Sequence, residues 1–359
     1  MHESPNSPLD ALDFKIIHVL QSDPRISWRA AADALGTDAA TVSRRWRRIK
    51  QGGHAWISVV EGVSRKSAVA LVEISCRPGH VLAVAELLAQ DPAVASVDVT
   101  SGRRDLLVTI LGQDDDDLVG PVLSLVGPQW GVRKAQSNVV NHHFKLGSDW
   151  RLQALSQEEL RRLPPPRPAR AASMKRVEPW LATAVIELLS ADGRATHAEL
   201  GATVGVSPQR AADAVSRLRA SGDLILRVDV ALRDSDWPVV AWYFIQAPAQ
   251  TVMGAQEALA DFAELQFAAT MTGPHSLIVA AACATRNDVV RVEAEIERRL
   301  PRAHIVDRSM VLRVYKHLGR VLDAHGRARP EPTGAESSEG PQLSEGPPPG
   351  VSGSTGETP

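Results

Sequence analysis

ISWRAAADALGTDAATVSRRWRRIKQGG, residues 26–53, is the stretch that decides the fold of the N-terminal region. Ser27 is placed to cap one helix that a glycine ends, and Thr37 is placed to cap the next helix. Apolar residues in that next helix recur at i, i+4 and i+7, the spacing of a helix with one buried face: Val42, Trp46 and Ile49. With a further amphipathic helix over 9–22, the pattern predicts a helix-turn-helix head within residues 1–60.

The outer face of this third helix is small at its start and basic further along. At 100° per residue, the side away from the apolar stripe carries Ala40, Thr41, Ser43, Arg44, Arg47 and Arg48. A helix presented in this way enters the major groove of DNA, where arginine holds guanine or grips a phosphate. We therefore expect these residues, together with Ser27 and Thr37, to contact double-stranded DNA. The alternative is a solvated helix face without a partner.

The sequence also repeats itself. A shift of 169 positions places the first head on residues 176–232, with Arg48 on Arg217. A shift of 171 places SGRRDLLVTI (101–110) on TGPHSLIVAA (272–281). The chain is therefore predicted to hold two copies of one unit, and residues 176–232 a second, degenerate helix-turn-helix domain.

The second head differs from the first on its outer face. Asp213 replaces Arg44, and Ser216 replaces Arg47. Because an acidic group approaches phosphates unfavourably, we expect this head to bind DNA more weakly or with a different specificity. Its remaining candidates for DNA contact are Ser207, Gln209, Arg210 and Arg217.

Each head is followed by the strand and helix order βαββαβ, which is typical of a ferredoxin-like sandwich. We expect these modules over 66–145 and 237–316, so the fold class is α+β, with two winged or tri-helical heads and two sandwiches. The elements of the first copy are expected at 68–75, 79–89, 94–100, 105–111, 117–126 and 132–139, and those of the second at 239–246, 252–261, 265–271, 276–283, 287–299 and 304–312. The apolar strands indicate that helices cover one sheet face and a partner sheet the other.

Two further segments have a composition unlike that of a packed domain. Residues 146–175 combine a short helix, signalled by a capping-box serine at 156, with a proline-rich spacer at 162–173. The tail, residues 326–359, is rich in Pro, Gly, Ser and Glu, and we expect it to be disordered.

Composition limits the classes of function. The formal net charge of −2 argues against a protein that coats nucleic acid uniformly, but it allows a local basic patch. Cys76 and Cys283 lie in apolar runs, so we expect buried thiols. No catalytic signature, zinc signature or phosphate loop stands out, and we expect no cofactor. Without a secretory signal or an apolar run of about 18 residues, the sequence predicts a cytoplasmic protein with no membrane partner.

LDALDFKIIHVLQSDPRISWRAAADALGTDAATVSRRWRRIKQGG (9–53) resembles the head of the Lrp/AsnC (feast/famine) regulators. The sheet module with SGRRDLLVTI resembles their regulator-of-amino-acid-metabolism (RAM) domain. The likeness covers about 1–145 and, more faintly, 177–318. It implies a transcription factor that dimerises through its sheets, often assembles further, and responds to an amino acid or related small molecule; some members of that family need no ligand.

In that family a Gly-x-x-Asp turn helps form the effector site. Here the turn is Gly102-Arg103-Arg104-Asp105, and in the second copy Gly273-Pro274-His275-Ser276, which lacks the carboxylate. The resemblance therefore implies that the effector contacts Thr100, Gly102, Arg103, Asp105, Gly273 and Ser276. The alternative is structural: Gly102 serves a tight turn and Asp105 bonds the loop backbone.

Other functions remain open at this point. Tandem units of this shape also resemble the siroheme decarboxylases, enzymes that need histidine and basic groups converging on a carboxylated tetrapyrrole. The candidate histidines are scattered in the sequence: His54, His142, His143, His275 and His304. A protein-binding scaffold is a third possibility. The two sandwiches can pair within one chain, as a pseudo-dimer, or between chains, as a homo-oligomer, and the sequence does not decide between them.

Overall fold

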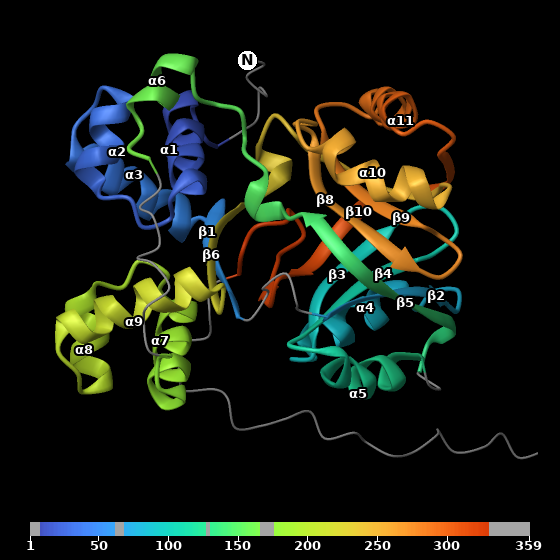
Figure 1. Cartoon of the computed structure of the whole chain (residues 1–359), viewed down its shortest axis with the longest axis horizontal. Helices are drawn as coiled ribbons and strands as arrows, with labels where there is room; N and C mark the ends of the chain where they lie inside the picture. The colour runs from blue at the N-terminus through green and yellow to red at the C-terminus, as the bar shows by residue number, and fades with distance from the viewer. Residues whose placement is uncertain (1–7, 62–67, 127–129, 166–175, 330–359) are drawn as a thin grey trace, which may run out of the picture. The chain divides into compact units, whose positions relative to one another are not determined.

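The computed structural model of the chain describes residues 8–61, 68–126, 130–165 and 176–329 (Figure 1). Most of the predicted disordered tail, from residue 330 on, lies outside the described residues, as does 166–175 of the predicted spacer. Residues 326–329, which were assigned to the tail, are placed: the Ala328 N–H donates to the Gly53 carbonyl at 3.0 Å. The described part of the chain therefore extends four residues into the segment that was predicted to be the tail.

The first head consists of three helices. Their bounds are α1 Ala11–Ser22, α2 Trp28–Leu35 and α3 Ala39–Gln51. Ser27 caps α2 as predicted, but α3 is capped by Asp38, whose carboxylate accepts from the Thr41 N–H at 2.8 Å. The prediction that Thr37 caps α3 was wrong, because the Thr37 N–H bonds back to the Ala32 carbonyl and closes the C-terminus of α2.

The inner face of α3 packs as its spacing predicts. Val42, Trp46 and Ile49 are buried in one core with α1 and α2. The second head has the same three helices: α7 Pro179–Ala191, α8 His197–Val204 and α9 Pro208–Ser221. Its core is separate and contains Val215 and Leu218 of α9.

Each head continues into a wing strand, and the two wings pair with each other. Strand β1 (Ala55–Glu61) follows α3, and β6 (Leu224–Val230) follows α9. They form an antiparallel two-stranded ribbon in which Ala55 lies opposite Val230. The sequence predicted winged heads but not this pairing, which joins positions far apart in the chain.

The turns of the two heads hold each other through a reciprocal pair of arginines. The Arg25 guanidinium donates to the Gly193 and Ala195 carbonyls at 2.9 and 2.8 Å. The Arg194 guanidinium donates to the Pro24 and Ile26 carbonyls at 2.6 and 2.7 Å. Because Arg25 and Arg194 are equivalent under the 169-residue shift, the heads meet about a local two-fold axis.

Two ion pairs repeat the same symmetry. Lys50 Nζ lies 3.0 Å from Asp192 Oδ1, and Arg219 lies 3.5 Å from Asp23. The same shift relates Lys50 to Arg219 and Asp23 to Asp192. Figure 1 shows the two heads next to each other, as these contacts require.

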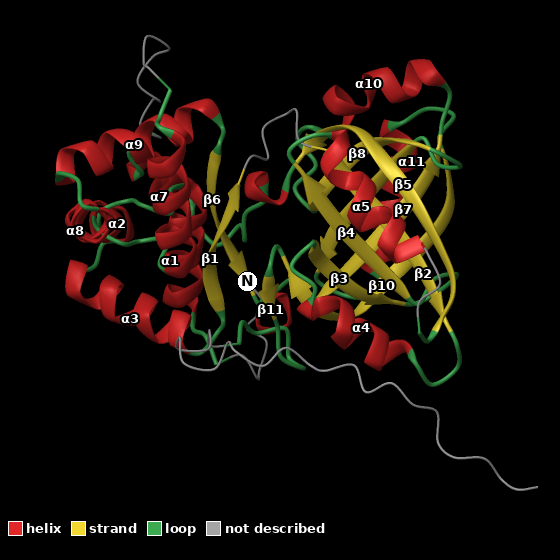
Figure 2. Cartoon of the chain, turned by 90° about the horizontal axis from the view of Figure 1, so that it is seen from below, coloured by secondary structure: helices red, strands yellow, loops and turns green. Residues whose placement is uncertain are grey.

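The remaining strands belong to one closed sheet. The first copy contributes β2 Ala68–Cys76, β3 Val94–Thr100, β4 Leu106–Gly112 and β5 Val132–Lys145; the second contributes β7 Val239–Gln246, β8 Leu265–Thr272, β9 Leu277–Cys283, β10 His304–His317 and β11 Arg320–Val321. Their order is β11-β10-β3-β4-β2-β5-β8-β9-β7, and β10 also pairs with β7, so the sheet closes into a barrel (Figure 2).

The last strand of each copy is longer than predicted. Strands β5 and β10 were expected to end at 139 and 312, but they run to 145 and 317. The extra length pairs with the other copy: Val140 lies opposite Met271, and Val314 opposite Asp98. The two sandwiches therefore pair within the chain as a pseudo-dimer.

Both faces of the sheet are covered, as the apolar strands indicated. The outer helices are α4 Val81–Gln90, α5 Asp115–Val126, α10 Ala249–Leu259 and α11 Asp288–Arg299. In β2, Ala70 and Val72 pack against the helices of their own copy, whereas Val69 and Leu71 point into the barrel and meet residues of the other copy such as Phe244. The sister copy supplies the second covering layer.

The connector after β5 packs on the first head. It contains a 3₁₀ turn η1 (Gly147–Asp149) and helix α6 (Gln157–Arg162), which begins at the predicted capping box. The His18 imidazole accepts from the Ala154 N–H at 3.0 Å, and burial lowers the pKa of His18 to about 4. A second 3₁₀ turn, η2 (Leu232–Asp234), follows β6.

Two predictions from composition can be compared with the structure. Cys76 and Cys283 are buried free thiols, as expected, and burial raises the pKa of each to about 11. Among the helices that the structure describes, none combines the length and apolar character needed to span a bilayer.

The reciprocal arginines generate a prediction for stability. Replacing Arg25 or Arg194 with alanine removes two hydrogen bonds from a charged donor to turn carbonyls, and each change is expected to lower the free energy of unfolding by about 2 kcal/mol. Urea unfolding monitored by circular dichroism measures this. The control is Arg29→Ala on the exposed side of α2, expected within about 0.5 kcal/mol of the unaltered protein. If the two variants lose no more free energy of unfolding than the Arg29→Ala control, the reciprocal arginines do not stabilise the contact between the heads.

Candidate functional site

The outer face of α3 presents the residues that the sequence predicted for DNA contact. Ala40, Arg44, Arg47 and Arg48 are exposed, and Thr41 and Ser43 are half-buried beside them. Ser27 is exposed at the start of α2, where its hydroxyl caps the helix. Thr37 is half-buried in the turn between α2 and α3. The candidates from Ala40 to Arg48 thus share one helix, whereas Ser27 lies at the start of α2 and Thr37 in the turn before α3.

Two arginines of α3 are tied to α1, and two are not. Asp13 is buried and ion-pairs with both Arg45, at 3.0 Å, and Arg48. The same carboxylate completes the capping box of α1. Within the described residues, Arg44 and Arg47 have no ion-pair partner, so their guanidinium groups remain available to an external anion.

On the second head, the corresponding polar residues already have partners. Gln209 donates to Asp213 at 3.0 Å, and Arg210 lies 2.9 Å from Glu178. Ser207 caps α9, and Arg217 is half-buried. The carboxylates of Asp213 and Glu178 therefore offset the positive charge on this face.

At the turns between β3 and β4 and between β8 and β9, the polar side chains bond the backbone. The Asp105 carboxylate accepts from the Cys76 N–H at 2.7 Å. The equivalent Ser276 hydroxyl accepts from the Ala247 N–H at 3.3 Å. The second copy thus keeps the backbone contact although it lacks the carboxylate, which favours the structural role for Asp105.

The other predicted effector residues surround these turns. Thr100 is buried, and its hydroxyl donates to the Arg104 carbonyl at 3.1 Å. Gly102 and Gly273 have φ of 96° and 139°, which L-residues rarely adopt. Gly102 and Arg103 are exposed, so they remain accessible to a ligand.

The residue of this turn that reaches furthest into the barrel is Arg104, which the sequence interpretation did not select. Its guanidinium is buried and donates to Glu73 at 2.7 Å, Asp307 at 2.6 Å and Ser309 at 2.7 Å. It also lies 3.8 Å from the ring centroid of Phe244. Arg104 therefore links both copies at one end of the barrel.

Two further polar side chains complete this cluster. Asn138 donates to Glu73 at 2.9 Å, while its buried carbonyl oxygen accepts no hydrogen bond from the residues that the structure describes. His275 is the counterpart of Arg104 under the 171-residue shift and packs edge-on to Phe244. Burial lowers the pKa of His275. The counterpart of Arg104 is thus a histidine whose protonated form is disfavoured by burial.

One sequence signal pointed to this cluster. A buried arginine next to a turn needs acidic partners, and Glu73 lies on the same face of its strand as the interior residues Val69 and Leu71. The partner Asp307 belongs to the other copy, and only the closed sheet shows that contact.

Comparison with known proteins identifies both heads. Residues 9–50 match the AsnC-type helix-turn-helix domain, and residues 183–222 match a winged helix-turn-helix DNA-binding domain. The HTH-type transcriptional regulator FL11 of Pyrococcus horikoshii is 27% identical over 136 residues, which are 37% of this chain and 89% of that protein. An uncharacterized HTH-type transcriptional regulator of Pyrococcus abyssi is 28% identical over 149 residues, 38% of this chain and 98% of that protein.

Among solved structures, the crystal structure of the siroheme decarboxylase NirDL has the same overall fold. It matches with a TM-score of 0.50 at 14% identity and covers 86% of this chain and 93% of that one. At this identity the likeness concerns the arrangement of two heads and two sandwiches only.

Asp105 allows a direct test of its role in the turn. Asp105→Ala leaves the buried Cys76 N–H without its acceptor and is expected to lower the free energy of unfolding by about 1–3 kcal/mol with no small molecule present. Asp105→Ser, the residue of the second copy, should lose less than half of that. Urea unfolding compares the two. Equal stability of the alanine variant and the unaltered protein would refute the structural role.

Proposed function

We propose that this chain, a Lrp/AsnC-type helix-turn-helix transcriptional regulator in tandem form, binds double-stranded DNA chiefly through its first head. The observation that carries the proposal is the exposed outer face of α3. Its N-terminal part is small, which lets the helix approach base edges, and Arg44 and Arg47 are free to reach bases or phosphates.

Asp13 supports this role from behind the helix. By holding Arg45 and Arg48 it fixes the side of α3 that faces α1, and it leaves the opposite side to the ligand. Arg48 is still exposed, with 58% of its side chain accessible, so it can also contact a phosphate at the edge of the face. We assign base contact to Ala40, Ser43 and Arg44, and phosphate contact to Thr41, Arg47 and Arg48.

The second head contributes less to binding. Its arginines are paired or half-buried, and Asp213 occupies the place of Arg44. We propose that Ser207, Gln209, Arg210 and Arg217 contact DNA weakly, in a half-site that differs from the first. Two unequal heads on one chain then select an asymmetric operator, whose half-sites are expected roughly 34 Å apart.

An effector of the amino-acid class is a further part of the proposal. The exposed residues Gly102 and Arg103 are accessible to it, beside Thr100 and Gly273. Asp105 and Ser276 would shape the turns that receive it. We also propose that the protein acts in the cytoplasm and that copies of it associate as homo-oligomers.

An enzyme related to the siroheme decarboxylases is the second candidate, favoured by the shared fold. Against it, the histidines have separate surroundings: His54 pairs with Asp234, His275 lies near Arg104, and His142 and His143 follow each other on β5. The absorbance spectrum of the purified protein distinguishes the candidates. A tetrapyrrole band in the visible region would favour the enzyme. If protein that has been incubated with the tetrapyrrole shows no such band, the enzyme is excluded.

Charge removal on α3 tests DNA binding. The double variant Arg44→Ala with Arg47→Ala is expected to bind the promoter region of its own gene at least roughly tenfold more weakly in gel-shift assays. The slope of log K against log salt concentration should become shallower by about 1 for each phosphate that the variant no longer neutralises. The matched control is Arg210→Ala on α9, expected to change affinity less than about threefold.

The outcomes separate two claims. If the α3 and α9 variants lose equal affinity, the inequality of the heads is wrong. If the unaltered protein shows no salt-sensitive association with the duplex, DNA binding through α3 is wrong.

A further inference from the structure

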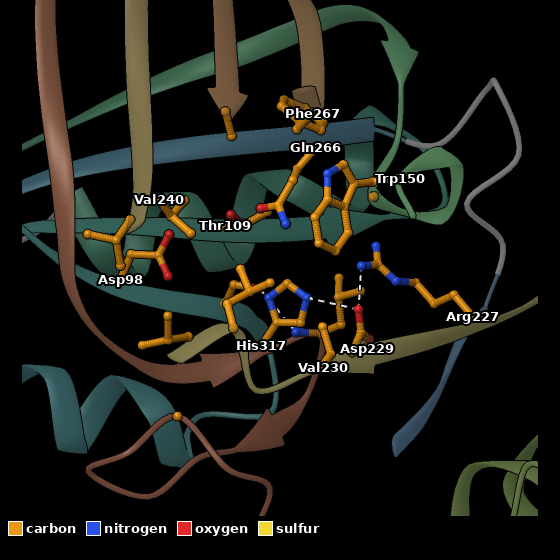
Figure 3. Close-up of a pocket in the computed structure, with 18 of the residues that line it drawn as sticks. Asp98, Thr109, Trp150, Arg227, Asp229, Val230, Val240, Gln266, Phe267 and His317 are labelled. Atoms are coloured by element: carbon orange, nitrogen blue, oxygen red, sulfur yellow. Dashed lines mark hydrogen bonds and ion pairs between the residues drawn. The ribbon is translucent and has the colours of Figure 1, made fainter. Parts of the chain in front are cut away.

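A cavity lies between the wing ribbon and the end of the barrel opposite the Arg104 cluster. Its volume is about 250 Å³, slightly below the usual range of small-molecule pockets, roughly 300–1,000 Å³. Residues of β1 and β6 line one side, strands of both copies line the other, and the η1 segment closes part of the rim. Figure 3 shows the labelled side chains pointing into this space.

Four large aromatic side chains line the cavity. Trp56 comes from the ribbon, Trp150 from the connector, and Trp242 and Phe267 from the barrel. Trp242 and Phe267 pack at 5.9 Å between ring centroids, yet both keep accessible surface inside the cavity. The Trp150 indole N–H is buried and donates to no atom of the described residues. Apolar surface that the protein leaves uncovered in its interior favours an apolar ligand.

Asp98 is an acidic residue of the cavity wall with few hydrogen-bond donors around it. It lies deep inside the protein on β3 but keeps accessible surface because it faces the cavity. Within the described residues, its carboxylate accepts one hydrogen bond, from the Trp242 indole N–H at 3.1 Å. Burial raises the pKa of Asp98 to about 6, against the opposing effects of His317 and Trp242. A carboxylate with so few donors is costly to ionise, and a cation beside it would lower that cost.

Of the other charged groups on the wall, Arg227, Asp229 and Arg233 have polar partners, whereas the buried Arg313 Nε donates no hydrogen bond to the described residues. Arg227 ion-pairs with Asp229, which also accepts from Ser58 at 2.5 Å and lies 3.3 Å from His317. Although burial alone would raise the pKa of Asp229, Arg227 and His317 hold it well below its ordinary value. Arg313 lies 3.9 Å from the ring centroid of Tyr315.

We propose that this cavity binds a small aromatic amine, with its ammonium group on Asp98 and its ring between the tryptophans and Phe267. Figure 3 places Asp98 at one side and Trp150 at the other, with Thr109, Gln266 and His317 between them. An ammonium group next to indole rings gains cation–π attraction in addition to the ion pair. A tetrapyrrole with its carboxylates is too large for this space and carries the wrong charge for Asp98.

The cavity also offers a route to the heads. Its ribbon wall, β1 and β6, continues directly from α3 and α9, so a ligand that contacts Trp56 and Val228 touches the segments that carry both heads. A ligand that fits one position of the ribbon better than another shifts the heads toward it. The claim that the ligand shifts the heads, the regulatory half of the proposal, rests on the proposed function. The claim that the cavity binds an amine does not.

Calorimetric titration of the full chain tests binding without DNA. Phenethylamine is the probe, and 3-phenylpropionate, of similar shape and opposite charge, is the matched comparison. We expect the amine to bind with a Kd of about 1 mM or tighter, the acid not to bind, and Asp98→Asn to weaken amine binding at least roughly tenfold. Ala280→Leu, which fills the cavity wall, should do the same, and Asp33→Asn on exposed α2 should change nothing.

Three results would overturn the proposal: no heat with the amine, equal or tighter binding of the acid, or amine binding that survives both Asp98→Asn and Ala280→Leu in folded protein. The regulatory half is measured separately, as a change of at least roughly threefold in DNA affinity when the amine is present. If the amine binds but DNA affinity does not change, only the coupling between the cavity and the heads is wrong. If the protein fails to bind DNA in the absence of amine, the proposed DNA contact of α3 is wrong instead.

Discussion

The structure depends on the strand exchange at the end of each copy. Strands β5 and β10 pair first with their own sandwich and then with the edge of the other, at Val140–Met271 and Val311–Thr100. Without these pairings, the inner faces of both sheets, with residues such as Leu71 and Phe244, would be exposed to water. Neither sandwich can therefore bury its inner face alone, and joining the two in one polypeptide removes the concentration dependence of that step.

The closed barrel also determines where the heads lie. Because both copies are fixed to each other, their wings meet as the β1–β6 ribbon, and the turns of the heads come close enough for Arg25 and Arg194 to exchange hydrogen bonds. In a free head, these arginines would lack the carbonyl acceptors that the other head provides. Here their reciprocal hydrogen bonds join the two heads to each other.

Local patterns in the sequence were sufficient for the heads and the order of strands, since helical spacing and strand alternation are short-range properties. The cap of α3 was misplaced because Thr37 and Asp38 are both good caps and only the backbone geometry selects Asp38. The lengths of β5 and β10, the ribbon and the partners of Arg104 depend on contacts between copies. Such contacts join residues more than 100 positions apart, and periodicity carries no information about them.

The Arg104 cluster shows what a single chain permits that a symmetric dimer does not. In a dimer of identical copies, two arginines would face each other across the axis with two sets of acids. Here His275 stands opposite Arg104, and the counterparts of Glu73 and Asp307 are Phe244 and Gln136. The site at Arg104 keeps the cation together with one acid from each copy, Glu73 and Asp307, and the equivalent site at His275 has lost the cation and both acids. The same freedom allows α9 to carry Asp213 where α3 carries Arg44. Duplication in one chain thus lets equivalent positions of the two copies carry different residues.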